Sequence, residues 1–267
     1  MSAFTNPLLT IWRNRRLIRS MVRRDILGRY RGSIGGVFWT VLNPLLLMLT
    51  YIFVFSVVLR ARFAGDPSRS GFVLYFLAGM LPWLPFSEAA GRAPTVMMEH
   101  RNFVKKLLFP LETLPVNLTA AGLVTQAFAL GLFLVLLVVE RGAPSPALVW
   151  LPALLVPQVL LTLGVCWFLA ALGVYVRDLG QINGFLLTLW FFLTPICYPE
   201  ASLPAGALGV LSRNPLFVLV RGYRAILLEG HAPALAPLAK LWLLSAVVSI
   251  LGHAWFYRLK STFADVI

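Results

Sequence analysis

Long apolar stretches make up most of this sequence, and they limit the fold more than any other feature. Six of them are separated by polar or basic segments, at residues 37–59, 72–91, 116–139, 148–176, 182–198 and 240–257. Only 12% of the 267 residues are charged, whereas a soluble domain carries roughly a quarter. Because too little polar surface remains to cover a water-soluble globule, the sequence predicts an all-α integral membrane protein with six transmembrane helices.

The first 36 residues form a basic segment, with eight arginines and the single acid Asp25. At helical spacing most of the arginines fall on one face. The opposite, apolar face consists of Ile11, Ile18, Met21, Val22 and Ile26. This pattern predicts an amphipathic helix in the headgroup plane, ended by Gly32, Gly35 and Gly36. The alternative is a solvated basic tail that only sets the topology.

Basic residues are divided unequally between the two sets of loops. With the N-terminus inside, the inner segments hold 15 lysines and arginines and the outer segments hold 8. The positive-inside rule then predicts that both termini are cytoplasmic. We expect no cleavable signal peptide, because the first apolar run follows the eight arginines.

Catalytic and nucleotide-binding patterns are missing from the sequence. It contains no G-x-x-x-x-G-K-[ST] loop, no H-E-x-x-H and no G-x-S-x-G. His100, His231 and His253 lie too far apart for metal-ligand spacing, and we expect no metal site. The formal net charge of +13 is spread between apolar runs, so nucleic-acid binding is not expected.

The predicted spans are nearly devoid of ionisable groups. Glu88 lies near the inner end of the second span, and we expect it to pair with Arg92, one helical turn later, instead of relaying protons. Ion-driven transport, which usually needs charged groups at mid-membrane, is therefore poorly supported.

Residues 199–239 differ from the spans because they hold five prolines and a short apolar stretch at 215–228. This stretch cannot cross about 30 Å of hydrocarbon, and it contains Arg221 and Arg224. It predicts a short re-entrant or interfacial helix lining a polar cavity, with a plain extracytoplasmic surface helix as an equal alternative.

Aromatic side chains are frequent in the first two predicted spans, at Tyr51, Phe53, Phe55, Trp83 and Phe86. Aromatic belts at the membrane interfaces are their simplest interpretation. A second interpretation is that these rings line a conduit and stack on sugar rings, which would let a polymer slide.

Several short segments occur in a characteristic order along nearly the whole chain. They are residues 25–39 (DILGRYRGSIGGVFW) with Asn43-Pro44, 102–115 (NFVKKLLFPLETLP), 176–179 (VRDL), 194–199 (TPICYP), and 214–216 (NPL) with 223–228 (YRAILL) and Gly230. Together they resemble the membrane subunit of type-2 ABC exporters for polysaccharides and polyol phosphates, the family that exports O-antigen and teichoic acid.

The resemblance implies an ATP-driven exporter of a polysaccharide such as O-antigen, expected to be lipid-linked, in the bacterial cytoplasmic (inner) membrane. Two copies of the chain would form a homodimer around a conduit. Each copy would pair with a separate ABC ATPase subunit, which would hold the ATP and Mg²⁺, so no cofactor is expected in this chain and it is not expected to be an enzyme.

The resemblance also assigns roles to particular residues. The membrane domain would cover residues 37–257, between the basic segment 1–36 and a cytoplasmic tail at 258–267. Its cytoplasmic loop 92–115 would contact the ATPase, helped by the turn at 177–178, through His100, Arg101, Asn102, Phe103, Lys105, Lys106, Arg177 and Asp178. Region 199–239 would form an extracytoplasmic gate with Asn214, Pro215, Phe217, Tyr223 and Arg224.

Three other functions are compatible with parts of the pattern. A type-2 ABC exporter of drugs or lipids would share the six spans, but often has a long outer domain before the last one. A membrane enzyme of glycan synthesis would need clustered acids or histidines, whereas the ten acidic residues here are dispersed. A passive channel would lack the coupling loop.

Overall fold

The computed structural model describes residues 7–29, 38–58, 71–105, 109–200 and 203–267, and within these ranges it is helical and contains no strand. Four helical stretches are long and apolar enough to cross a membrane. They contain α4 (Gly71–Arg92) with its continuation through a 3₁₀ turn (Ala93–Thr95) into α5 (Val96–Glu99), α7 (Thr113–Arg141), α8 (Leu151–Tyr175) preceded by Pro146–Trp150, and α12 (Leu235–Leu259) with its continuation through Lys260–Thr262 into α13 (Phe263–Val266). The prediction of an all-helical fold with long apolar helices is thus confirmed.

Two further helices coincide with the predicted first and fifth spans. α3 (Trp39–Ile52) continues into a π-helical turn (Phe53–Val58), and α9 (Leu179–Phe192) has 14 residues. Fourteen residues rise only about 21 Å, which is less than the hydrocarbon thickness of a bilayer. The count of six complete spans therefore stays a prediction.

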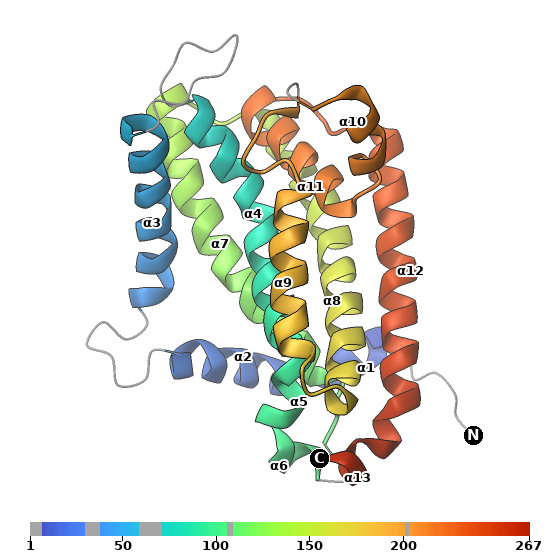
Figure 1. The fold of residues 1–267 in the computed structure, drawn as a ribbon. Helices are drawn as coiled ribbons and strands as arrows, with labels where there is room; N and C mark the ends of the chain where they lie inside the picture. The colour runs from blue at the N-terminus through green and yellow to red at the C-terminus, as the bar shows by residue number, and fades with distance from the viewer. Residues whose placement is uncertain (1–6, 30–37, 59–70, 106–108, 201–202) are drawn as a thin grey trace.

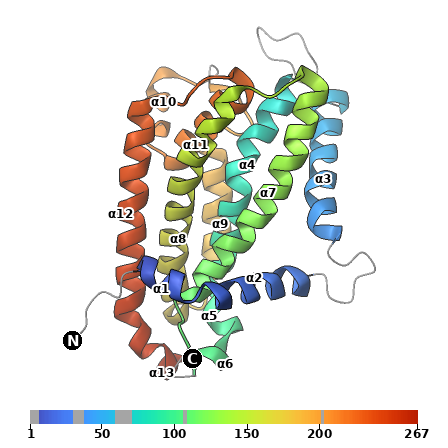
Figure 2. The same cartoon turned by 180° about the vertical axis from the view of Figure 1, so that it is seen from behind.

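The long helices run side by side, and the short helices lie at the two ends of the bundle (Figure 1). α1 (Pro7–Arg13) and α2 (Arg15–Arg29) cross one end, which also holds α5, α6 (Arg101–Val104) and α13 (Figures 1 and 2). α10 (Ala205–Leu211) and α11 (Pro215–Arg224) lie at the other end. The predicted coupling loop and gate region are therefore at opposite ends of the molecule.

α8 and α12 pack closely because glycines face each other where they cross. A Cβ built on Gly252 would lie 2.1 Å from the carbonyl oxygen of Gly164, and one on Gly164 would lie 2.4 Å from that of Val248. Small residues of this kind let two helix backbones approach within a membrane.

α4 passes through both of its prolines, Pro82 and Pro85, without a break. Neighbouring helices surround this segment, and such packing tolerates proline in a membrane helix. At Pro85 the adjacent helix α7 carries Gly122, whose added Cβ would lie 2.9 Å from the Pro85 carbonyl oxygen.

The predicted N-terminal helix is present as α2, and its apolar face is covered by protein. Ile18 and Met21 are buried in a cluster with Ala89, Val96 and Leu114 of the bundle. Its position in the headgroup plane stays a prediction. At the other terminus Phe263 is buried against Phe256 and Tyr175, so part of the expected polar tail is a docked helix.

Candidate functional site

The predicted coupling residues form a compact surface around α5 and α6. The ring of His100, between the two helices, stacks on Phe103 at 6.0 Å, and Phe103 stacks on Phe109 at 4.7 Å. Arg24 of α2 places its guanidinium 5.6 Å from the Phe103 ring. The aromatic stack therefore ties α6 to the following loop and to α2.

The polar members of this surface face outward. Arg101, Asn102 and Lys105 are exposed, and Lys106 lies outside the described residues. Arg177 and Asp178 are also exposed, in the turn between α8 and α9 at the same end of the bundle (Figure 1). We call the exposed residues Arg101, Asn102, Lys105, Arg177 and Asp178, together with His100 and Phe103, the coupling surface.

An ion pair links α2 to the end of α4, which leads into this surface. The Arg92 guanidinium donates two hydrogen bonds to the Asp25 carboxylate, from Nη1 to Oδ2 at 3.0 Å and from Nη2 to Oδ1 at 2.8 Å. The predicted local ion pair of Arg92 with Glu88 is therefore replaced by a pair with Asp25, 67 residues away in the sequence. A carboxylate from another helix can meet both guanidinium nitrogens, and this two-point geometry is the strongest that an arginine makes.

A second ion pair fastens the far end of the coupling loop. Lys260 Nζ lies 2.6 Å from Glu112 Oε2, and Trp167 Nε1 donates to the Glu112 carbonyl oxygen at 3.1 Å. Residues 92–115 are thus held at both ends by contacts with other helices.

At the opposite end, Asn214 joins the start of α11 to the end of α9. Its Oδ1 accepts from the Leu216 backbone N–H at 3.0 Å, which caps α11, and from Trp190 Nε1 at 2.9 Å. Its Nδ2 donates to Thr194 Oγ1 at 3.0 Å. Pro215 occupies the first helical position, where its missing N–H costs nothing.

α11 is enclosed by protein, so the plain surface helix is not what the structure shows. Phe217, Tyr223 and Arg224 of the predicted gate are all buried, while Arg221 is exposed and lies 3.3 Å from Glu200.

Beyond α11, a hydrogen bond to the Ala232 carbonyl and the nearby Glu229 carboxylate raise the pKa of His231.

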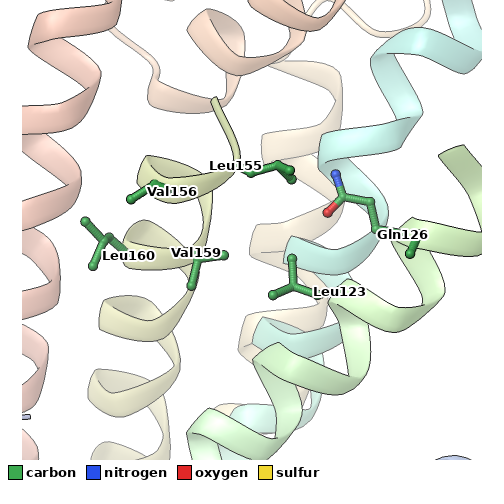
Figure 3. Close-up of a pocket in the computed structure, with 7 residues that line it drawn as sticks. Leu123, Gln126, Leu155, Val156, Val159 and Leu160 are labelled. Carbon is green, nitrogen blue, oxygen red and sulfur yellow. The ribbon is translucent and has the colours of Figure 1, made fainter. Parts of the chain in front are cut away.

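A closed polar network holds Tyr223 against two long helices. Its hydroxyl donates to Gln158 Oε1 of α8 at 2.8 Å and accepts from Gln126 Nε2 of α7 at 2.8 Å, while Gln158 Nε2 donates to Gln126 Oε1 at 3.0 Å. Gln126 also borders a cavity of about 390 Å³ between α7 and α8, where it and Leu123 face Leu155 and Val159 (Figure 3). Three mutually bonded side chains thus fix α11 inside an otherwise apolar region.

Arg224 makes a second anchor for α11. Its Nε donates to the Tyr75 carbonyl at 3.1 Å, its Nη2 donates to the Ile196 carbonyl at 3.2 Å, and its guanidinium lies 3.3 Å from the centre of the Tyr75 ring. Nη1 is buried and has no hydrogen-bond partner among the described residues. Gly79 gives this side chain room, because an added Cβ there would lie 2.8 Å from Nη2.

We expect Tyr223→Phe to destabilise the chain by about 1 to 2 kcal/mol, because Gln126 and Gln158 lose a buried hydrogen-bond partner. Thermal unfolding of the detergent-solubilised chain measures this. Tyr198→Phe is the matched control, since its hydroxyl donates to the Phe192 carbonyl in an exposed position. Equal midpoints for the two variants would contradict the proposed role of the network.

Residues 16–228 match the ABC-2 type transporter family. The chain is 34% identical over 260 residues to the O-antigen export system permease protein RfbA of Myxococcus xanthus, covering 96% of this chain and 97% of that protein. It is 26% identical over 253 residues to a protein of the same name from Klebsiella pneumoniae, covering 94% and 95%.

The chain belongs to the ABC-2 type transporter family. The resemblance noted in the sequence is therefore confirmed, and with it the assignment to a membrane-embedded transport subunit.

The aromatic residues predicted to line a conduit in this ABC-2 subunit separate into two groups. Trp83 and Phe86 are buried in the core, against Phe191 and Trp190 respectively. Tyr51 is half-buried against Phe76, and Phe53 is 57% exposed. The side chain of Phe55 lies outside the described residues. Trp83 and Phe86 therefore cannot touch a substrate in this arrangement.

Sequence reasoning missed a more exposed apolar face on α9. Phe185 is 69% exposed, and it shares one face of the helix with other large apolar residues. The exposed set is Ile182, Phe185, Leu186, Leu189, Phe192 and Leu193. The apolar residues of this face do recur at a spacing of three and four residues in the sequence. However, α9 is apolar almost all round, so this spacing alone did not separate its exposed face from its buried face.

Proposed function

We propose that this ABC-2 subunit exports a lipid-linked polysaccharide such as O-antigen across the cytoplasmic membrane, powered by a separate ABC ATPase. The observation that carries the proposal is the spatial arrangement. A rigid, exposed coupling surface lies at one end of the bundle, and an enclosed short helix tied by Asn214, Tyr223 and Arg224 lies at the other. The names of the relatives support the polysaccharide substrate.

Energy would enter through the coupling surface. Its exposed charged side chains would bind in a groove of the ATPase. The stack of His100, Phe103 and Phe109 would hold α6 in place when the ATPase moves. Closure of two ATPase subunits around ATP would draw two coupling surfaces together. The long helices would then tilt, with one end of α4 and one end of α12 held by ion pairs.

A second copy of the chain would complete the transport path. The exposed face of α9 is apolar, yet the helix is about 9 Å too short to match the lipid on its own, and that mismatch disfavours a helix surrounded by lipid. A partner subunit that faces α9 across the path would shield this face from lipid and so remove the mismatch. The faces of α3 and α9, with Phe53, Phe185 and Phe192, would line the path, and aromatic rings suit weak, sliding contacts with sugars.

The test is purification of the tagged chain from its native host in a mild detergent. We expect an ATPase subunit to co-purify in equal amount, and Phe103→Glu to reduce its recovery at least tenfold, because an added charge disrupts the aromatic stack. Val149→Glu adds the same charge at an exposed position at the other end of the bundle and should have no effect.

Export itself supplies the second measurement. Cells carrying Phe103→Glu should accumulate lipid-linked polysaccharide inside. If no ATPase were recovered even after crosslinking, the chain would be a channel or an enzyme instead. If an ATPase co-purified with the wild-type chain and the polysaccharide still reached the surface of cells that carry Phe103→Glu, the exporter would serve a different substrate.

A further inference from the structure

A groove on the outer surface of α8 and α12 has features that the export function does not use. It encloses about 560 Å³, and apart from Arg258 at one end its lining is apolar or glycine. The residues that line it are Gly164, Val165, Phe168, Leu169, Val248, Leu251, Gly252, Ala254, Trp255 and Arg258. From this arrangement we propose that the groove binds one anionic phospholipid, with an acyl chain between α8 and α12 and the phosphate at Arg258.

The length of the groove fits one leaflet. From Val248 to Arg258, α12 rises about 15 Å, which is half of a hydrocarbon core of about 30 Å. Arg258 lies in the last turn of α12, at the end of the bundle where α2 and α13 lie (Figure 1). A lipid of that leaflet would thus reach Arg258 with its headgroup while its chain filled the groove.

The shape of the groove follows from the glycine crossing. At Gly164 and Gly252 the backbones of α8 and α12 touch, so the floor of the groove is backbone instead of side chains. Phe168 of α8 and Trp255 of α12 border the groove, with ring centres 5.7 Å apart, and both are partly exposed. An aromatic wall near the interface is the kind of surface on which an acyl chain packs.

The charge selects the headgroup. Arg258 is exposed and, among the described residues, has no ion pair with a carboxylate. The nearby Glu112 carboxylate is neutralised by its ion pair with Lys260. It therefore repels a phosphate less than an unpaired carboxylate would. A headgroup with a net negative charge is therefore favoured over a zwitterionic one.

The proposal is tested by native mass spectrometry on the full chain in mild detergent. The chain is offered equal amounts of phosphatidylglycerol and phosphatidylcholine with identical acyl chains. We expect one retained phosphatidylglycerol per chain, and a roughly fivefold loss of its preference over phosphatidylcholine in Arg258→Gln. Arg213→Gln, an exposed arginine at the other end, is the matched control and should keep the preference.

A second variant separates the chain site from the headgroup site. Ala254→Trp fills the groove and leaves Arg258 in place, so it should lose retention of both lipids. Unchanged retention in Ala254→Trp, or unchanged selectivity in Arg258→Gln, would overturn the proposal. The proposal would also be overturned if the wild-type chain were a dimer without bound lipid and Ala254→Trp converted it to a monomer. The groove would then be a contact between two copies of the chain.

Fluorescence provides a measurement that does not depend on Ala254→Trp folding. Phosphatidylglycerol brominated on its acyl chains should quench Trp255, and the difference between the wild-type chain and Trp255→Phe isolates that signal. Equal fractional quenching in both would show that no acyl chain occupies the groove.

Discussion

Replacing Gly252 by leucine is expected to remove most of the folded chain from the membrane. The first added carbon would lie 2.1 Å from the Gly164 carbonyl oxygen, and backbone on both sides leaves nothing that can rotate away. Overpacking of a core typically costs about 1 to 3 kcal/mol, and a contact with backbone belongs at or above the upper end of this range. The yield and the unfolding midpoint of the detergent-solubilised chain measure the loss.

Gly131→Leu is the matched control for this effect. Gly131 also lies within a long membrane helix, α7, but an added Cβ there has no atom within 4 Å. Its yield should stay close to that of the wild-type chain. Similar losses in both variants would mean that leucine in any of these helices is harmful, and that the α8–α12 crossing has no special role.

Arg224→Ala is expected to destabilise the chain by about 3 to 5 kcal/mol. The Ile196 carbonyl loses its Arg224 donor at a cost of about 1 to 3 kcal/mol, the Tyr75 carbonyl keeps only its bond within α4, and the vacated volume adds a cavity term. Arg224→Met should lose about half as much, since it keeps most of the volume and removes the buried Nη1 that has no partner.

The comparison for Arg224 lies three residues earlier in the same helix. Arg221 is exposed and pairs with Glu200 at 3.3 Å, so Arg221→Ala should cost less than about 1 kcal/mol. Thermal unfolding under one detergent condition ranks the three variants. If Arg224→Ala unfolded at the same temperature as Arg221→Ala, the anchoring role of Arg224 in α11 would be refuted.

The long helices could be predicted from the sequence because a bilayer imposes a local requirement. The run 116–139 is mostly apolar and contains no charged residue, and the observed α7 extends this run by only a few residues at each end. The short helix at 215–228 was also recognisable, since its length and its two arginines conflict with a full span. These features depend on neighbours along the chain.

Contacts between distant segments could not be predicted in the same way. Spacing of four residues favoured Glu88 as the partner of Arg92, whereas the fold supplies Asp25 from another helix. Tyr223 meets Gln126 across 97 residues, and no pattern in a single sequence records that pairing. Trp83 and Phe86 were candidates for a conduit only as the second interpretation of the aromatic residues, because a sequence shows which residues are aromatic but not the direction in which they point.

The bidentate contact between Arg92 and Asp25 has a mechanical consequence. It fixes α2 to the segment that runs directly from α4 into α5, so α2 cannot stay still when that segment moves. A displacement of α5 and α6 by the ATPase would therefore move α2 as well. On the proposed function, and with α2 in the headgroup plane as predicted, this motion would disturb the headgroup layer in the same step that tilts the bundle, and a lipid-linked polysaccharide could enter there.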